Sequence, residues 1–398
     1  MRSHSPAFAQ FRALVERDPS LQERLYRPDD PAVLIELVVA AARDHGLNLD
    51  PADVDGAIRA NRQIPAEERG APSPPPGWLP VRTRWQSQDL MLDWAYLGRR
   101  RLLEPFFDES VLRCMSKPFN RLFDYSTPID ALAGWLKQHP GLPPTGFIFH
   151  MSRCGSTLVA QMLAAMARNI VISEAGPIDA VVQARRNQPD FDEEQHAVWL
   201  RWIIGALGQP RSGGERHVFI KLDSWHALAL PLFRRAFPTV PWMFLYRDPL
   251  DILVSQLRRR GMHMVPGLID LDVFGFETSQ SAGTQEIYCA QVLERIGDGV
   301  LRNYAPGQAL LVNYNELPAA LWTDVLPHFG VACSVDDRAA MMAAARYDAK
   351  NPERPFIDDT AAKRNAATDQ IRAAAERLDD LHARLETLRL ARRDGDRF

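Results

Sequence analysis

One short segment of the sequence combines the residue types that bind phosphate groups. The apolar run Phe147–Phe149 leads through a few small and polar residues into a helical pattern. The N-terminus of a helix offers unpaired N–H groups and a partial positive charge, so a loop that enters one is suited to hold a phosphate. Arg153, Ser156 and Thr157 add a guanidinium and hydroxyl donors. The segment therefore predicts a phosphate-binding loop, although no lysine stands where the G-x-x-x-x-G-K-[ST] pattern of ATP- and GTP-binding loops requires it.

A second segment places another arginine at the end of an apolar run. Trp242–Tyr246 predicts a strand and is followed by Arg247, while Asp248 and Pro249 are a typical helix N-cap and first helical residue. Steps of three and four residues place Ser255 on the same helix face as Asp248. An arginine and a serine eight residues apart predict a second phosphate site.

Together the two segments resemble the sulfotransferase family, whose members move a sulfuryl group from 3′-phosphoadenosine 5′-phosphosulfate (PAPS) to a hydroxyl or amine acceptor, with 3′,5′-ADP as the nucleotide product. In that family a [KR]-S-G-[ST]-T core binds the 5′-phosphosulfate, and an arginine with a serine eight positions later binds the 3′-phosphate. The first motif here is Arg153-Cys154-Gly155-Ser156-Thr157, with cysteine in place of the usual serine, and Arg247 to Ser255 has the spacing of the second. In a third motif, Leu311–Leu317, Tyr314 is similar to the tyrosine that approaches the adenine, and Asn315 replaces the usual glutamate.

The resemblance also implies catalytic residues. Lys221, at the end of an apolar run, is similar to the lysine that several members direct at the bridging oxygen as the sulfuryl group departs, where it offsets developing negative charge. Some members place a histidine base two residues after that lysine; Asp223 stands there, and His226 lies three residues further on. Others use a glutamate at about the distance that separates Glu174 from Arg153, which is 21 residues. We expect Glu174 to deprotonate the acceptor, with Asp223 and His226 as alternatives.

Two later loops complete this picture. Lys350 resembles a lysine that reaches the 3′-phosphate from the loop that closes over the nucleotide in this family, and Arg354 or Lys363 would assist it. The connection Met262–Gly283 lies between two helical stretches, and a connection of this length in a compact domain is often functional. We expect it to shape the acceptor site.

These assignments predict in-line sulfuryl transfer without a metal ion, driven mainly by positioning and electrostatics. Two other functions fit parts of the pattern. A P-loop kinase or NTPase would use Asp248, at the end of an apolar strand, to bind magnesium, but the missing lysine argues against it. A non-catalytic protein would use the same fold only to bind a peptide or a nucleotide. A peptide tyrosine, a carbohydrate and a small hydroxylated metabolite are all compatible acceptors.

The elements that must position these residues follow from the apolar runs after residue 146. The runs are Gly146–Met151, Ile170–Ser173, His217–Leu222, Pro241–Tyr246 and Ala309–Tyr314, and they alternate with longer amphipathic stretches. Such runs are typical of strands buried on both faces of a parallel sheet. We therefore expect an α/β fold in three layers, with helices on both faces of a P-loop-type parallel sheet and ligands at the carboxyl ends of its strands.

The rest of the chain suggests flanking regions. Residues 1–65 predict a small all-α domain, and residues 6–63 of it resemble a Nif11-type domain. The proline-rich stretch 66–80 predicts a linker, and residues 81–145 predict a connecting helical layer. We expect the sulfotransferase domain to span 146–360. Residues 361–398 predict a C-terminal helix, and its apolar stripe is compatible with a homo-oligomer.

Composition excludes several classes of function. The 398 residues include 47 basic and 50 acidic side chains, so the net charge of −3 provides no general attraction for nucleic acid. No apolar run approaches the roughly 18 residues of a membrane span, and no secretion signal is evident, so we expect a cytoplasmic protein without a membrane partner. The four cysteines are widely separated, which argues against a disulfide framework and a zinc site.

Overall fold

The computed structural model describes residues 6–60, 74–277, 283–355 and 364–395. They form two compact units. The first comprises 1–142, 175–191 and 201–215, and the second comprises 143–174, 192–200 and 216–398. The helix α10 (Glu193–Leu207) contributes residues to both.

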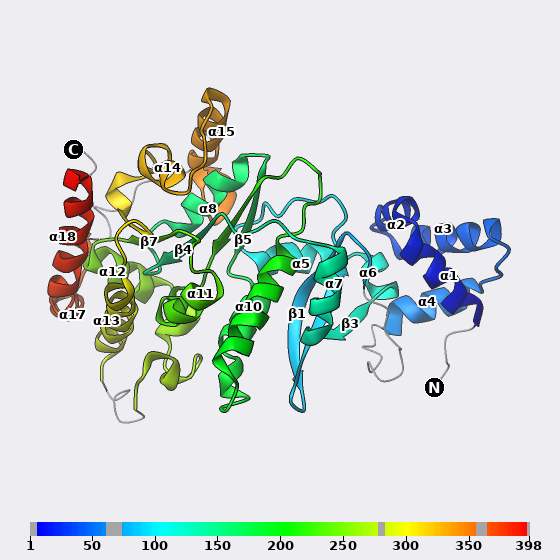
Figure 1. Ribbon diagram of the computed structural model, residues 1–398, viewed down its shortest axis with the longest axis horizontal. Helices are drawn as coiled ribbons and strands as arrows, with labels where there is room; N and C mark the ends of the chain where they lie inside the picture. Colours follow the sequence, from blue (N-terminus) through cyan, green and yellow to red (C-terminus); the bar gives the residue numbers. More distant parts are fainter. Residues whose placement is uncertain (1–5, 61–73, 278–282, 356–363, 396–398) are drawn as a thin grey trace. The chain divides into compact units, whose positions relative to one another are not determined.

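The second unit is built on a parallel sheet of five strands in the order β5-β6-β4-β7-β8. Figure 1 labels β4, β5 and β7 of this sheet. Their bounds are β4 Gly146–His150, β5 Asn169–Ser173, β6 His217–Lys221, β7 Trp242–Tyr246 and β8 Ala309–Asn313. All five apolar runs predicted as strands are therefore confirmed. The first of these strands in the chain, β4, lies in the middle of the sheet. The next two strands, β5 and β6, lie between β4 and one lateral edge, and the last two, β7 and β8, lie between β4 and the opposite edge, so the direction of strand addition reverses at β4. In α/β folds, ligands bind beyond the carboxyl ends of the strands at such a reversal.

Helices cover both faces of this sheet, which confirms the predicted three-layer α/β/α class. On one face, alternate strand residues such as Ile148 and Met243 pack into a core with α8 (Ser156–Ala165), α14 (Leu326–His328) and α15 (Val335–Ala345). On the other face, Phe147 and Phe149 contact Phe233 of α11 (Leu230–Ala236), with ring centroids 5.3 and 5.4 Å apart. The remaining helices of the sheet region are α12 (Pro249–Arg258) and α13 (Gln285–Asn303), and a two-stranded hairpin joins β9 (Tyr347–Asp348) to β10 (Asn351–Pro355).

The C-terminal region is two helices, so the prediction of a single helix over 361–398 is wrong. They are α17 (Asp369–Glu376) and α18 (Asp379–Gly395). The acidic pair Asp379 and Asp380 occupies the first turn of α18, where the helix dipole favours negative charge, and this preference marks a new helix start. The carboxylate of Glu386 in α18 accepts hydrogen bonds from Tyr246 and from Asn313 Nδ2, the latter at 2.7 Å. These bonds fix α18 to the ends of β7 and β8.

The first unit contains an antiparallel sheet, which corrects the prediction of a helical layer over 81–145. The strands β1 (Trp78–Gln86), β2 (Asp89–Tyr96) and β3 (Tyr125–Pro128) pair in that order. The turn between β1 and β2 contains no glycine, and Ser87 adopts φ of 57° instead, so the usual hairpin signal is missing from the sequence. This unit also contains the helices α5 (Phe107–Met115), α6 (Pro118–Leu122), α7 (Leu132–Gln138) and α9 (Gly176–Val182).

The N-terminal helices share the core of the first unit. They are α1 (Pro6–Arg17), α2 (Pro19–Tyr26), α3 (Pro31–Asp44) and α4 (Pro51–Ala60). Tyr26 of α2 contacts Tyr96 of β2 at 5.1 Å and Phe119 of α6 at 5.9 Å between ring centroids. A separate helical domain over 1–65 is therefore not observed, because these aromatic contacts join it to the sheet. The resemblance to a Nif11-type domain stays a prediction.

The predicted linker over 66–80 is only partly described. Residues 66–73 lie outside the described part of the chain, and β1 begins at Trp78, inside the predicted linker. The carbonyl of Pro74 accepts a hydrogen bond from Trp135 Nε1 at 2.6 Å. This end of the stretch is therefore packed structure. Among the described residues, no helix has both the length and the apolar character needed to span a bilayer.

Candidate site at the carboxyl ends of the parallel strands

Each strand of the parallel sheet ends at a residue or motif that the sequence singled out. Glu174 follows β5, Lys221 is the last residue of β6, and the loop 151–155 follows β4. Arg247 follows β7, and Tyr314 follows β8. Because all these strands run in the same direction, the residues lie along one edge of the sheet.

The loop between β4 and α8 has a strained backbone. Ser152 and Arg153 have φ of 65° and 48°, and Gly155, the N-cap of α8, has φ of 87°. A left-handed conformation costs a non-glycine residue about 1–2 kcal/mol, so two in succession must be held by their surroundings. The Ser152 N–H donates to His150 Nδ1 at 3.0 Å, and Ser152 Oγ accepts from Gln256 Nε2 at 2.8 Å. The N-cap of α8 is Gly155, which has no side chain to cap the helix, and the N-terminus of a helix favours an anion.

Positive charge gathers at this loop. Arg153 Nη2 donates to the carbonyl of Arg259, while Arg153 Nε is buried and has no hydrogen-bond partner among the described residues. Burial and the charge of Arg259 lower the pKa of Arg153. Lys350 is exposed as a residue, but loss of hydration around its ammonium group, together with the charges of Arg153 and Lys221, lowers its pKa to about 8. Cations that raise each other's energy in this way favour binding of an anion between them.

The second motif forms a buried ion pair beside an aromatic ring. Arg247 is 4% exposed, and its Nε and Nη2 each lie 3.1 Å from Asp251 Oδ2. Its guanidinium carbon is 4.1 Å from the centroid of the Tyr314 ring. Asp248 caps α12 by accepting from the N–H groups of Leu250 and Asp251, as the sequence predicted. An anion at this end of α12 would therefore depend on side chains rather than on open helix N–H groups.

Tyr314 brings the two motifs together. A Cβ atom on Gly155 would lie 2.7 Å from Cδ2 of Tyr314 and 3.1 Å from Cδ1 of Leu317. The backbone of the first loop therefore lies directly against the ring on which Arg247 stacks. Glycine is required at 155 for both its positive φ and this close approach.

Glu174 and Lys221 form an ion pair at the ends of β5 and β6. The Glu174 N–H donates to the carbonyl of Lys221 at 2.8 Å, and the two side chains are in direct contact. Lys221 is only 1% exposed. Burial alone would raise the pKa of Glu174, but the charge of Lys221 and a hydrogen bond from His150 outweigh it and hold that pKa well below its usual range. The carboxylate is therefore ionised at neutral pH.

His150 connects this ion pair to the loop. Its Nδ1 accepts from the Ser152 N–H, so in the neutral ring the proton is on Nε2. Nε2 lies 2.8 Å from the carbonyl of Leu222 and 3.3 Å from Glu174 Oε1. Burial lowers the pKa of His150, which favours this neutral form. His150 belongs to no motif of the sequence, and only its place at the end of β4, directly before the predicted phosphate-binding loop, marks it as a site residue.

Several predicted residues have other surroundings. The Cys154 side chain is fully buried, and its Sγ lies 3.1 Å from the carbonyl of Leu245, so a contact of Cys154 with the nucleotide would involve its backbone, and this role stays a prediction. Its thiol packs into the core because β4 turns directly into α8. Ser255 is half-buried on α12, and Arg354 is exposed on β10, so their roles stay predictions. Lys363 lies outside the described residues.

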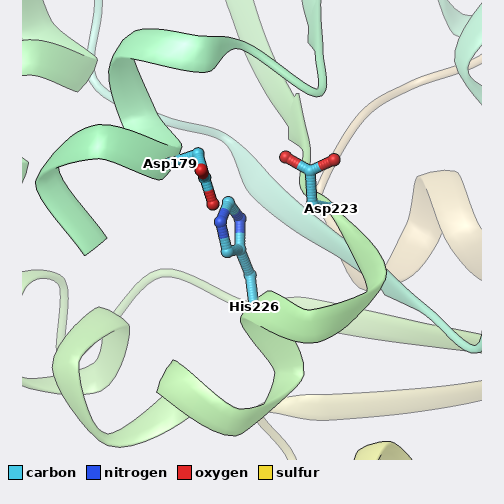
Figure 2. Close-up of side chains that lie close together, drawn as sticks. All are labelled: Asp179, Asp223 and His226. Atoms are coloured by element: carbon cyan, nitrogen blue, oxygen red, sulfur yellow. The ribbon is translucent and has the colours of Figure 1, made fainter. Parts of the chain in front are cut away.

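The alternative bases lie on the turn that follows β6. Figure 2 shows Asp223 and His226 on this turn, and a carboxylate oxygen of Asp223 lies within 4.8 Å of a ring nitrogen of His226. His226 is 1% exposed, and its ring centroid lies 5.8 Å from that of Trp225 and 6.3 Å from that of Phe233. This packing gives His226 the surroundings of a core residue, and its role as a base stays a prediction, as does that of Asp223.

Comparisons with known proteins give distant matches only. No family model and no curated protein matches the sequence. The sulfotransferase domain of the Synechococcus PCC 7002 olefin synthase is 16% identical at a TM-score of 0.37, and the alignment covers 60% of this chain and 96% of that one. The sulfotransferase domain from the curacin biosynthetic pathway is 15% identical at a TM-score of 0.40, and the alignment covers 60% of this chain and 98% of that one. The sulfotransferase STF1 from Mycobacterium tuberculosis H37Rv is 14% identical at a TM-score of 0.36, and the alignment covers 66% of this chain and 83% of that one. At these values the similarity assigns neither a family nor a function to the chain.

Proposed function

We propose that this protein transfers a sulfuryl group from PAPS to a hydroxyl or amine acceptor. One observation carries the proposal: Tyr314 lies against Gly155 of the first anion-binding motif and under Arg247 of the second. Two anion-binding motifs that meet at one aromatic ring match a nucleotide with a phosphate at each end of its ribose.

The residues of both motifs fit such a ligand. In the first motif, Arg153 Nε, which is buried without a partner among the described residues, and the N-terminus of α8, whose N-cap is Gly155, would offer donors for the 5′-phosphosulfate. In the second, Arg247 would hold the 3′-phosphate together with Ser255, which lies one helical turn beyond Asp251. Tyr314, which lies between the two motifs, would approach the base. Lys350 would add a further charge to the site.

When bound, PAPS supplies an activated sulfuryl group attached to a phosphate leaving group. Lys221 would offset the charge that develops on this phosphate. Glu174 would accept the proton of the acceptor hydroxyl. The two roles are coupled, because any shift of the Lys221 ammonium toward the leaving phosphate weakens its attraction for Glu174. The pKa of Glu174 then rises, and the carboxylate becomes a better proton acceptor as the proton must leave.

Calorimetry with 3′,5′-ADP tests the nucleotide, and transfer of radiolabelled sulfate from PAPS tests the reaction. We expect 3′,5′-ADP to bind the protein and Arg247→Met to weaken that binding at least about tenfold, since a charge-assisted contact contributes about 1.5–3 kcal/mol. The matched control is Arg302→Met. Arg302 is exposed near the end of α13, shortly before β8 begins, and the amino end at which this parallel strand begins is opposite to the carboxyl ends that form the site.

Acceptors from each open class, a tyrosine peptide, a carbohydrate and a phenol, are offered in the transfer assay. Magnesium-dependent hydrolysis of ATP in place of 3′,5′-ADP binding would support a P-loop NTPase instead. Tight binding of 3′,5′-ADP without transfer to any acceptor would favour a non-catalytic binding protein.

A further inference from the structure

Gln256 is a fully buried polar residue in the last turns of α12, and both ends of its carboxamide are bonded. It is 0% exposed. Its Nε2 donates to Ser152 Oγ at 2.8 Å, and its Oε1 accepts from the Gly261 N–H at 3.0 Å. A buried amide that satisfies groups on two separate segments constrains both, because each broken bond would leave a buried polar group unpaired.

The first of these segments is the strained loop. Gln256 holds Ser152, and the carbonyl of Arg259 accepts from Arg153, so the C-terminal end of α12 bonds both left-handed residues of the loop. The same helix begins at Asp248, directly after Arg247. One helix of 10 residues therefore has the second anion-binding motif at its start and the clamp on the first loop at its end.

The second segment lies just beyond α12. Gly261 is bonded to Gln256, and a Cβ atom on it would lie 2.6 Å from Cε1 of His263, so the two residues are in close contact. The His263 ring centroid is 5.6 Å from that of Trp225, and its Nε2 is buried without a hydrogen-bond partner among the described residues. Gln256 thus also positions the start of the 262–283 connection, which the sequence analysis linked to the acceptor.

We propose that Gln256 is a positioning residue that fixes the 5′-phosphate loop to the helix carrying the 3′-phosphate residues, so that the two pockets act as one nucleotide site. This inference rests on the proposed function. Without the Gln256 bond, the left-handed conformation of Ser152 loses one of the contacts that hold it, and the loop donors lose their fixed distance from Arg247.

The test compares two ligands on one variant by calorimetry. Gln256→Met keeps the length of the side chain and removes both hydrogen bonds. We expect the Kd of 3′,5′-ADP to rise about tenfold, which is within the range of coupling between contacting residues. The Kd of adenosine 3′-monophosphate, which lacks the 5′-phosphate, should change less than twofold. A loss that depends on the 5′-phosphate is a result that general damage to the fold would not produce.

Gln22→Met is the matched control. Gln22 is 1% exposed, and its Nε2 donates to the carbonyl of Val15 at 2.8 Å in the first unit. The control variant should lose stability and bind both ligands as the wild type does. If Gln256→Met does not fold, Ser152→Ala removes the same bond from the other side. Equal binding of 3′,5′-ADP by Gln256→Met and the wild type, or an equal loss for both ligands, would overturn the proposal.

Hydrogen exchange separates this inference from the proposed function. In the absence of any nucleotide, the amides of residues 151–157 should exchange faster in Gln256→Met than in the wild type, and at the wild-type rate in Gln22→Met. If the wild type does not bind 3′,5′-ADP, the proposed function fails, and exchange in this loop alone then decides the role of Gln256. Unchanged exchange would refute the positioning role.

Discussion

Replacement of Gly155 by alanine should damage both of the proposed anion-binding motifs at once. The residue has φ of 87°, and a Cβ atom would lie 2.7 and 2.9 Å from two ring carbons of Tyr314 and 3.1 Å from Leu317. The left-handed backbone costs alanine about 1–2 kcal/mol, and overpacking against the ring adds about 1–3 kcal/mol. We therefore expect Gly155→Ala to lower the free energy of unfolding by about 2–5 kcal/mol. Tyr314 must also shift, and this removes the surface on which Arg247 stacks.

A matched glycine separates the backbone strain from the steric contact. Gly307 has φ of 83°, lies in the same unit, and would have no atom within 4 Å of an added Cβ. Gly307→Ala should cost only the backbone term of about 1–2 kcal/mol. Urea unfolding gives the two stabilities, and calorimetry gives the Kd of 3′,5′-ADP. We expect Gly155→Ala to raise that Kd at least about tenfold and Gly307→Ala to leave it unchanged. Wild-type affinity in Gly155→Ala would refute the argument that the motifs meet at Tyr314.

Three further predictions concern charged groups. Lys221→Met should lower the free energy of unfolding in urea by about 3 kcal/mol, because it leaves the Glu174 carboxylate without the charge that lowers its pKa. Adding Glu174→Gln should recover part of that loss. If nothing is recovered, the ion pair is contradicted. Well below pH 8 the ammonium form of Lys350 is complete, so Lys350 should cause no pH dependence of the Kd of 3′,5′-ADP. Above pH 8 calorimetry should show this Kd rising by up to about tenfold per pH unit, because an anion needs the ammonium form and the pKa of Lys350 is about 8. Lys350→Met should lack this slope. Burial tends to raise the pKa of Glu386, but hydrogen bonds from Arg389 and Tyr246 lower it from 4.5 to about 2, so its contribution to stability is complete above pH 4.5 and is lost as the pH falls toward 2. Acid unfolding should show a smaller loss in Glu386→Gln, and identical curves would count against this account.

The strand positions could be predicted because the parallel strands are continuous apolar runs. Such runs are typical of strands that helices cover on both faces, and β4 to β8 all match predicted runs. The sheet of the first unit gave no comparable signal. Its strand β2 is buried at most positions on both faces, and the turn at Ser87 lacks glycine, so neither alternation nor a turn motif marked the hairpin. The C-terminal helices were merged because their apolar stripe continues across the break.

The site could be predicted only as far as its residues are close in sequence or follow strand ends. The pairing of Glu174 with Lys221 follows from the neighbouring ends of β5 and β6, which strand order determines and the sequence does not. His150 and Gln256 were missed because a histidine at a strand end and a glutamine in a helix carry no motif. Their importance comes from hydrogen bonds to Ser152, and these depend on the three-dimensional path of the loop.

The strained residues of the site fit the proposed transfer reaction better than simple binding. Ser152, Arg153 and Glu174 are three of the four described non-glycine residues with positive φ, and each departs from what local preferences favour. His150 accepts from the Ser152 N–H and lies 3.3 Å from the Glu174 carboxylate, so one neutral imidazole holds both strained segments. A protein that only bound a nucleotide would need the loop but not a carboxylate held beside it. The structure maintains strain at the carboxylate as well as at the loop, which is expected where an anion and a proton acceptor must be positioned together.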